Sequence, residues 1–214
     1  DFLKDLNQNN NREWFLENKL RYENHVKQPF EDFISDMIFR IREDDENLII
    51  SAKDAIFRIY RDIRFSKDKT PYKNHVSAII SNGGRKNLTD PGIYIEITHE
   101  RLRFYSGLYQ PNTEQLEKIR NHIVSNLNNF NKLLSDKIFK KYFGEILGEQ
   151  NKRIPKEFNE AVKKQPLIMN KQFYFFAEIP EKKILSKNLS QELMKYYYAA
   201  KPLNVFFKEA LLSK

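Results

Sequence analysis

The stretch RIYRDIRFSKDKTPYKN, residues 58–74, sets three arginines, three lysines and two aspartates among residues typical of a buried strand. Arginine suits two-pronged binding of phosphate or carboxylate, because its planar guanidinium presents several N–H donors in a fixed fork. Arg58, Arg61 and Arg64 are therefore the first candidates for binding an anionic group. The chemistry that this stretch predicts is recognition of phosphate or carboxylate.

If residues 57–65 form a β-strand, their side chains alternate between two faces. Arg58 and Arg64 then flank Asp62 on one face, a spacing that can hold the guanidinium groups in position. Arg61 falls on the other face, in an otherwise apolar row made by Phe57, Ile59, Ile63 and Phe65. An unpaired buried charge costs several kcal/mol, so Arg61 must bind a carboxylate or line a wet or liganded cavity.

The segment after this predicted strand, SKDKTPYKN, reads as a loop that adds further polar side chains beside the arginines. Loops carried by a rigid sheet are common places for binding groups. Lys69 and Lys73 are predicted to bind the anion, with Tyr72 as a hydrogen-bond donor. Asp62 or Asp68 would serve as general base or orient the arginines.

The same stretch resembles the signature R-x-x-R-D-x-R-F-x-x-D-K-x-P-Y-K of a bacterial protein family without an established activity. The matching positions are Arg58, Arg61-Asp62, Arg64-Phe65, Asp68-Lys69 and Pro71-Tyr72-Lys73. The segments NNNREWFLENKLRYE, LYQP and LEKIRNHI are also similar to that family, whereas YSGLYQP has one glycine in place of a cluster and RIPKEF has Glu157 in place of a glycine. The resemblance implies a single domain over residues 1–214 and implies no particular reaction.

The N-terminal part of the chain is predicted to be helical. Over residues 11–41 large apolar side chains recur every three or four positions, as they do on one face of a helix. Pro29 is expected to separate two helices there or to begin the second. The acidic residues 43–46 that follow predict a solvated turn.

The middle of the chain contains short runs rich in Ile, Val, Tyr and Phe, broken by turn residues, which is typical of β-strands. The predicted strands are IFRIY, HVSAIIS, GIYIEIT and RLRFYSG. The last two fit a hairpin with His99-Glu100 as its two-residue loop. This register places Glu96 opposite Arg103 on one face and apolar pairs on the other, so charge and hydrophobicity agree.

Helices and one strand are predicted for the C-terminal half. One helix is expected from Asn112 or Thr113 to about residue 130, with a capping pattern at its start, and another over about 132–143. FYFFAEI, residues 173–179, is the last predicted strand, and the tail is predicted to be helical with a break at Pro202. These elements predict an α+β fold, with a largely antiparallel central sheet flanked by N-terminal and C-terminal helices in a single domain.

Composition limits the partners and the compartment. The formal net charge of +8 favours anionic partners, although most basic residues are mixed with acidic ones. The absence of cysteine excludes disulfides and thiolate chemistry, and it favours a reducing cytoplasm. No apolar run approaches the roughly 20 residues that span a bilayer, so no membrane partner is expected. The N-terminus does not have the layout of a signal peptide. The chain as given lacks an initiator Met, so a short leader before Asp1 is left open as an alternative.

Motifs for metals and cofactors are missing from the sequence. Its four histidines form no zinc-ligand pattern, and it contains neither a phosphate-binding glycine motif nor a nucleophile elbow. No metal and no cofactor are therefore predicted.

Three functions remain compatible with the sequence. The first is an enzyme or binding protein whose pocket holds an anionic small molecule through the Arg/Lys/Asp cluster. The second is nucleic-acid binding by the same loop, although Asp62 and Asp68 would repel a phosphate chain. The third is a scaffold protein in which the Arg/Asp motif is only structural.

Overall fold

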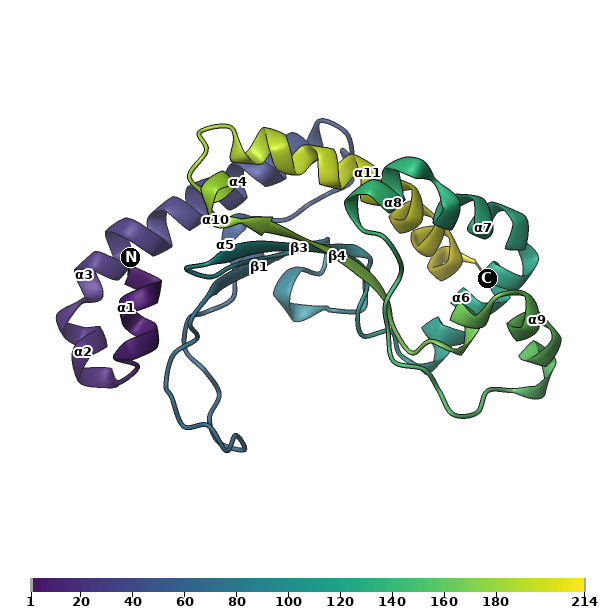
Figure 1. The fold of residues 1–214 in the computed structure, drawn as a ribbon, viewed down its shortest axis with the longest axis horizontal. Helices are drawn as coiled ribbons and strands as arrows, with labels where there is room; N and C mark the ends of the chain where they lie inside the picture. Colours follow the sequence, from purple (N-terminus) through teal and green to yellow (C-terminus); the bar gives the residue numbers. More distant parts are fainter. Residues whose placement is uncertain (1, 214) are drawn as a thin grey trace. The chain divides into compact units, whose positions relative to one another are not determined.

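The structure is a computed structural model that describes residues 2–213 (Figure 1). Within that range, one antiparallel sheet has four strands in the order β1-β2-β3-β4, so strands that follow one another in sequence are paired. The strands are β1 (Val76–Ile80), β2 (Gly92–Ile97), β3 (Arg101–Leu108) and β4 (Phe173–Pro180). Helices precede, separate and follow them, which confirms the predicted α+β class.

The β2–β3 hairpin has the predicted register. The backbone N–H of Thr98 donates to the carbonyl of Arg101 at 2.9 Å, which closes the expected two-residue loop. The Thr98 hydroxyl also accepts from the N–H of Arg101 at 3.2 Å. Glu96 and Arg103 face each other across the strands, with 3.6 Å between a carboxylate oxygen and a guanidinium nitrogen. The side-chain pairing therefore specifies this hairpin without an Asn-Gly turn.

The N-terminal region is helical, as predicted. Its elements are α1 (Phe2–Gln8), α2 (Arg12–Glu17), α3 (Lys19–Tyr22), the π-helical turn η1 (Glu23–Lys27) and α4 (Gln28–Arg42). The Asn11 side chain caps α2 by accepting from the N–H of Trp14 at 2.9 Å. Pro29 lies in the first turn of α4, which follows the π-helical turn η1 directly with Lys27 and Gln28 in helical conformation, so it begins the second of two joined helices, one of its two expected roles. The acidic residues 43–46 lie in the turn after α4.

The chain forms two compact units. Unit 1 comprises residues 2–86, 94–104 and 178–194, and unit 2 comprises residues 87–93, 105–177 and 195–213. Strands β2, β3 and β4 each contribute residues to both units, so neither unit is one continuous piece of chain. The single domain expected over residues 1–214 stays a prediction.

Unit 1 is completed by three short elements besides its share of the strands. They are α5 (Ala52–Ala55), the 3-10 turn η2 (Gly84–Lys86) and α10 (Glu181–Ile184). Its core includes side chains that are completely buried from α1, α4, β2 and β3. Examples are Leu6, Ile34, Met37, Ile95 and Phe104.

Unit 2 has an aromatic core, formed by buried side chains that include Phe130, Phe173, Phe175, Phe206 and Phe207. Its helices are α6 (Thr113–Ser125), α7 (Leu127–Ser135), α8 (Lys137–Tyr142), α9 (Asn159–Lys164) and most of α11 (Leu189–Leu212), with 3-10 turns η3 (Lys156–Phe158) and η4 (Pro166–Met169). Asn112 and Gln115 form a reciprocal capping box at the start of α6, so the predicted cap is confirmed.

Two helical predictions for unit 2 are wrong in their boundaries. Three helices replace the two expected over 112–143, because Asp136 begins a new one by accepting from the N–H groups of Ile138 and Phe139. The expected break at Pro202 is absent, since α11 is continuous through that position. Proline removes one backbone bond, but Phe206 and Phe207 just beyond it are fixed in the aromatic core.

Among residues 2–213, no helix combines the length and the apolar character that crossing a bilayer requires.

Candidate anion-binding site

Residues 57–75 contain the signature motif and form an irregular hairpin, which we call the signature loop; in Figure 1 it is the long blue loop that extends beyond β1. The predicted strand over 57–65 is wrong. Isolated bridges pair Ile56 with Ala78 and Tyr60 with Tyr72, but no continuous ladder joins them in the described chain. Pro71 has no N–H to give to a ladder, and the Asp62 carboxylate accepts from the backbone N–H of Arg64 at 3.3 Å, which turns the chain.

Arg61 has a carboxylate partner, which was one of the two predicted alternatives. Its guanidinium donates to the side chains of Asp68 and Thr70 across the loop. Asp68 also accepts from the backbone N–H of Thr70 at 2.9 Å. These hydrogen bonds, the one from Arg61 above all, lower the pKa of Asp68 to about 2. Arg61 therefore braces the loop internally.

The tip of the loop is braced in the same way. Arg64 binds Asp62 with two hydrogen bonds of 3.0 and 2.7 Å, and these bonds lower the pKa of Asp62 to about 2. Lys69 donates to the carbonyl of Ile63 at 3.0 Å. The structure thus places Asp62, Arg64 and Lys69 in contacts within the loop, and their predicted catalytic and binding roles stay predictions.

Tyr72 is held against the N-terminal helices and is buried. Its ring stacks on Phe15 with the centroids 4.0 Å apart and the planes 13° apart. The Asn10 side chain binds both backbone groups of Tyr72, donating to its carbonyl at 2.9 Å and accepting from its N–H at 3.1 Å. Tyr72 therefore anchors the base of the signature loop.

Lys73 turns toward the sheet at the end of the loop. Its ammonium nitrogen lies 5.1 Å from the ring centroid of Phe57. Burial, with a contribution from the Arg58 charge, lowers the pKa of Lys73, while Glu96 opposes the shift. The charges of Lys73 and Arg58 therefore act on each other, whereas Arg61 and Arg64 pair with aspartates, and the predicted binding roles of all four stay predictions.

Arg58 lines a cavity of about 540 Å³, which we call the basic pocket. Six basic and two acidic residues contribute to its wall: Lys19, Lys27, Lys53, Arg58, Arg85 and Lys86, with Glu23 and Glu31. They come from α3, η1, α4, α5, the start of the signature loop and η2. All belong to unit 1. Such an excess of positive charge in a concave site favours a compact anion.

Gly84, the first residue of η2, positions the two basic residues that follow it. Gly84 has φ of +51°, and a Cβ there would lie 2.8 Å from the carbonyl oxygen of Asp54. Because Gly84 has no side chain, η2 can lie directly on α5. Arg85 then donates to the carbonyl of Lys53 and, at 2.9 Å, to that of Ile56. This contact keeps α5, η2 and the start of the signature loop together.

Most of the basic pocket was missed by reasoning from the sequence. Arg58 was predicted, but Lys53, Arg85 and Lys86 lie outside the signature and belong to none of the predicted sites. One signal was present, because Gly83-Gly84 is followed at once by two basic residues. Its meaning depends on the contact between η2 and α5, which no local pattern reveals.

Comparison with known proteins assigns the chain to a family. A family described as conserved hypothetical protein, DUF2461, matches residues 1–206. The chain belongs to DUF2461. The expected membership of a family without a known activity is therefore confirmed. A search of curated proteins finds no match to this DUF2461 chain.

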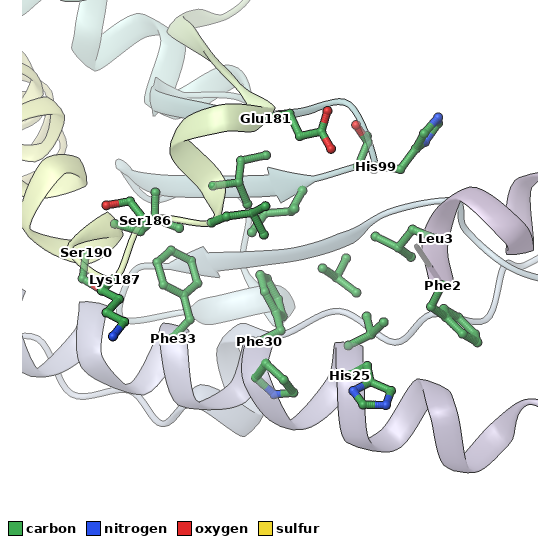
Figure 2. A pocket seen from close by; sticks show the side chains of 18 of the residues that line it. Phe2, Leu3, His25, Phe30, Phe33, His99, Glu181, Ser186, Lys187 and Ser190 are labelled. Atoms are coloured by element: carbon green, nitrogen blue, oxygen red, sulfur yellow. The ribbon is translucent and has the colours of Figure 1, made fainter.

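A second and larger cavity of unit 1, of about 840 Å³, has a mostly apolar lining, as the basic pocket also has. Figure 2 shows Phe30 and Phe33 pointing from α4 toward the sheet in this cavity, with His99 and Glu181 at its edge. Two of its charged residues have partners, since Arg21 pairs with Asp5 at 2.5 Å and Asp36 pairs with Arg40 at 2.9 Å. The larger cavity of the DUF2461 chain therefore lacks the excess of positive charge that marks the basic pocket.

A polar cluster lies beside the signature loop on β2, β3 and β4. Glu96 lies 3.9 Å from His75 and 3.6 Å from Arg103, and Glu178 lies 3.2 Å from Arg103. Burial lowers the pKa of His75, with Lys73 also lowering it and Glu96 opposing the shift. Acidic and basic groups here neutralise each other, which is typical of a structural network.

In the part of the chain that the structure describes, no three His, Asp or Glu side chains lie close enough together to hold a metal ion.

Proposed function

We propose that this DUF2461 protein binds a small anionic molecule, bearing phosphate or carboxylate, in the basic pocket. The observation that carries the proposal is the ratio of six basic to two acidic residues in one cavity wall. Arg58 belongs to this wall and joins it to the signature loop.

Several basic residues of the pocket have no acidic partner among the described residues. Within residues 2–213, no carboxylate lies at ion-pair distance from Lys27, Lys53, Arg58 or Lys86. Like charges that line one concave surface repel each other, so a bound anion would relieve that repulsion. An anion with several oxygens fits this arrangement better than a single carboxylate, because it can accept from several donors at once.

Pyrophosphate is a suitable first probe, because it is small and carries several acceptor oxygens. Isothermal titration calorimetry of the wild-type protein is expected to show one site with affinity that falls as salt is added. Arg58→Gln is expected to weaken this binding by about tenfold, since a charged hydrogen bond contributes about 1.5–3 kcal/mol and 1.4 kcal/mol corresponds to tenfold.

Arg64→Gln is the matched control. It removes the same charge from the same loop, but Arg64 pairs with Asp62 at the exposed tip. Pyrophosphate affinity should stay within about twofold of wild type. Equal losses in the two variants would mean that the whole basic surface attracts the anion without a site, and absence of any binding to wild type would end the proposal.

A further inference from the structure

The basic pocket also has an aromatic wall, which bears on the kind of anion it would accept. Its lining includes Phe15, Tyr22, Phe57 and Tyr60 beside the basic residues. A pocket for a bare inorganic anion has no use for several rings. With aromatic rings next to cationic side chains, proteins can bind a base and its phosphate at the same time.

Tyr60 has the properties of a stacking surface. Its ring is supported from within unit 1 by Tyr72, with centroids 5.4 Å apart, and by Phe15 at 6.2 Å. Tyr60 is nevertheless 51% exposed while it lines the pocket. A ring that is fixed by packing and still open to solvent can stack on a planar ligand with little loss of side-chain entropy.

Two further groups of the pocket wall can bind polar edges of a ligand. Burial, with added effects of Tyr60, Glu31 and Glu23, raises the pKa of Tyr22 to about 12, so its hydroxyl keeps its proton and can donate. The Glu31 carboxylate has no ion pair in the described chain and can accept from a hydroxyl or amino group. These groups suit a sugar or a base better than a phosphate.

Basic and aromatic side chains are interleaved in the pocket wall, with Arg58 between Phe57 and Tyr60 in the sequence. Lys53 and Arg85 are linked at the start of the signature loop by the hydrogen bonds to the Lys53 and Ile56 carbonyls. Tyr60 lies four residues beyond Ile56, and an extended chain of that length covers up to about 13 Å. Lys53, Arg85 and Tyr60 therefore lie within the reach of one molecule that carries phosphate at one end and a planar ring at the other.

We infer that the ligand of the basic pocket is a nucleoside phosphate, bound by Lys53, Arg58 and Arg85 at its phosphates and by Tyr60 at its base. This inference rests on the proposed function. A cavity of about 540 Å³ matches one nucleotide rather than a strand. Glu23 and Glu31 in its wall would also repel the successive phosphates of a nucleic acid.

The test compares ligands that share phosphate and differ in the ring. Calorimetry at fixed salt would measure pyrophosphate, ribose 5-phosphate, the common nucleoside mono-, di- and triphosphates, and a ten-nucleotide DNA strand. The best nucleotide is expected to bind about tenfold more tightly than ribose 5-phosphate, an advantage typical of one stacked base. Tyr60→Leu should remove this advantage and leave pyrophosphate affinity within about twofold, whereas Tyr60→Phe should retain it.

Tyr109→Leu is the matched control, because Tyr109 is similarly exposed, at 54%, and does not line the pocket. Thermal melting of each variant would verify folding. Pyrophosphate bound as tightly as every nucleotide would overturn the inference and leave the proposed function standing. No binding of any anion would overturn both, and a DNA strand that binds more tightly than any mononucleotide would replace the inference with nucleic-acid recognition.

Discussion

Asn10 is the residue that ties the signature loop to the N-terminal helices. Its amide binds both the N–H and the carbonyl of the buried Tyr72. Asn10→Ala would leave these two backbone groups without their partner, which costs about 1–3 kcal/mol for each buried group. Urea denaturation is expected to show a loss of at least about 1 kcal/mol in the free energy of unfolding.

Asn9→Ala provides the comparison for this prediction. The Asn9 side chain donates to the carbonyl of Asp5 at an exposed helix end, so its removal should change the free energy of unfolding by less than about 0.5 kcal/mol. If Asn10→Ala were as mild as Asn9→Ala, the signature loop would not depend on this contact.

His75 makes stability depend on pH. Burial and the Lys73 and Arg61 charges lower its pKa below the ordinary 6.5, while Glu96 acts in the opposite direction. The unfolded chain therefore binds a proton at this residue more readily than the folded one. Stability should be highest above pH 6.5 and should fall as the pH drops through 6.5 toward the lower folded pKa.

Chemical denaturation between about pH 5 and 8 would measure this slope. His75→Gln should flatten it, and His25→Gln, which changes an exposed histidine on η1, should not. A slope that is identical in wild type and His75→Gln would show that the polar cluster does not disfavour the charged imidazole.

The contact between the two short elements η2 and α5 shapes the basic pocket. Gly84→Ala should destabilise the fold by about 1–3 kcal/mol, because it forces a side chain into a left-handed conformation against the Asp54 carbonyl. By moving Arg85 and Lys86, it should also weaken pyrophosphate binding. Denaturation and calorimetry on the same variant would check both effects.

Gly83→Ala is the control for this element, since Gly83 does not have the positive φ that Gly84 has. It should leave both stability and pyrophosphate affinity nearly unchanged. Loss of stability with intact affinity in Gly84→Ala would mean that η2 is a structural turn only.

The elements differ in how far their sequence predicts them. The β2–β3 hairpin was predictable, because apolar alternation and the Glu96–Arg103 pair both act between near neighbours. The strand over 57–65 was not, because Arg61 and Asp62 bind side chains within the loop and Pro71 interrupts the opposite leg. The basic pocket depends on contacts among α3, η1, α4, α5 and η2, so only Arg58 of its cations was found.

The two units are expected to unfold together, because three strands contribute residues to both. Trp14, the single tryptophan, lies in unit 1, where its ring is 5.5 Å from that of Phe2. Phe207→Ala removes a completely buried ring of unit 2 and should cost about 3–5 kcal/mol. Trp14 fluorescence should report this loss in full.

Hydrogen exchange of α7 in unit 2, measured over the same urea series, should give the same midpoint as Trp14 fluorescence. A Trp14 midpoint that is unchanged by Phe207→Ala would instead show that the units fold independently. That result would also contradict the single domain predicted over residues 1–214.

The internal pairing of the signature loop affects what a shared motif can tell about relatives. Arg61 pairs with Asp68 and Arg64 pairs with Asp62, so these four residues of the motif help to hold the loop in its shape. Two members of DUF2461 could therefore share the motif and differ in ligand. Positions 53, 85 and 86, outside the motif, would be the ones to compare before an activity found for one member is transferred to another.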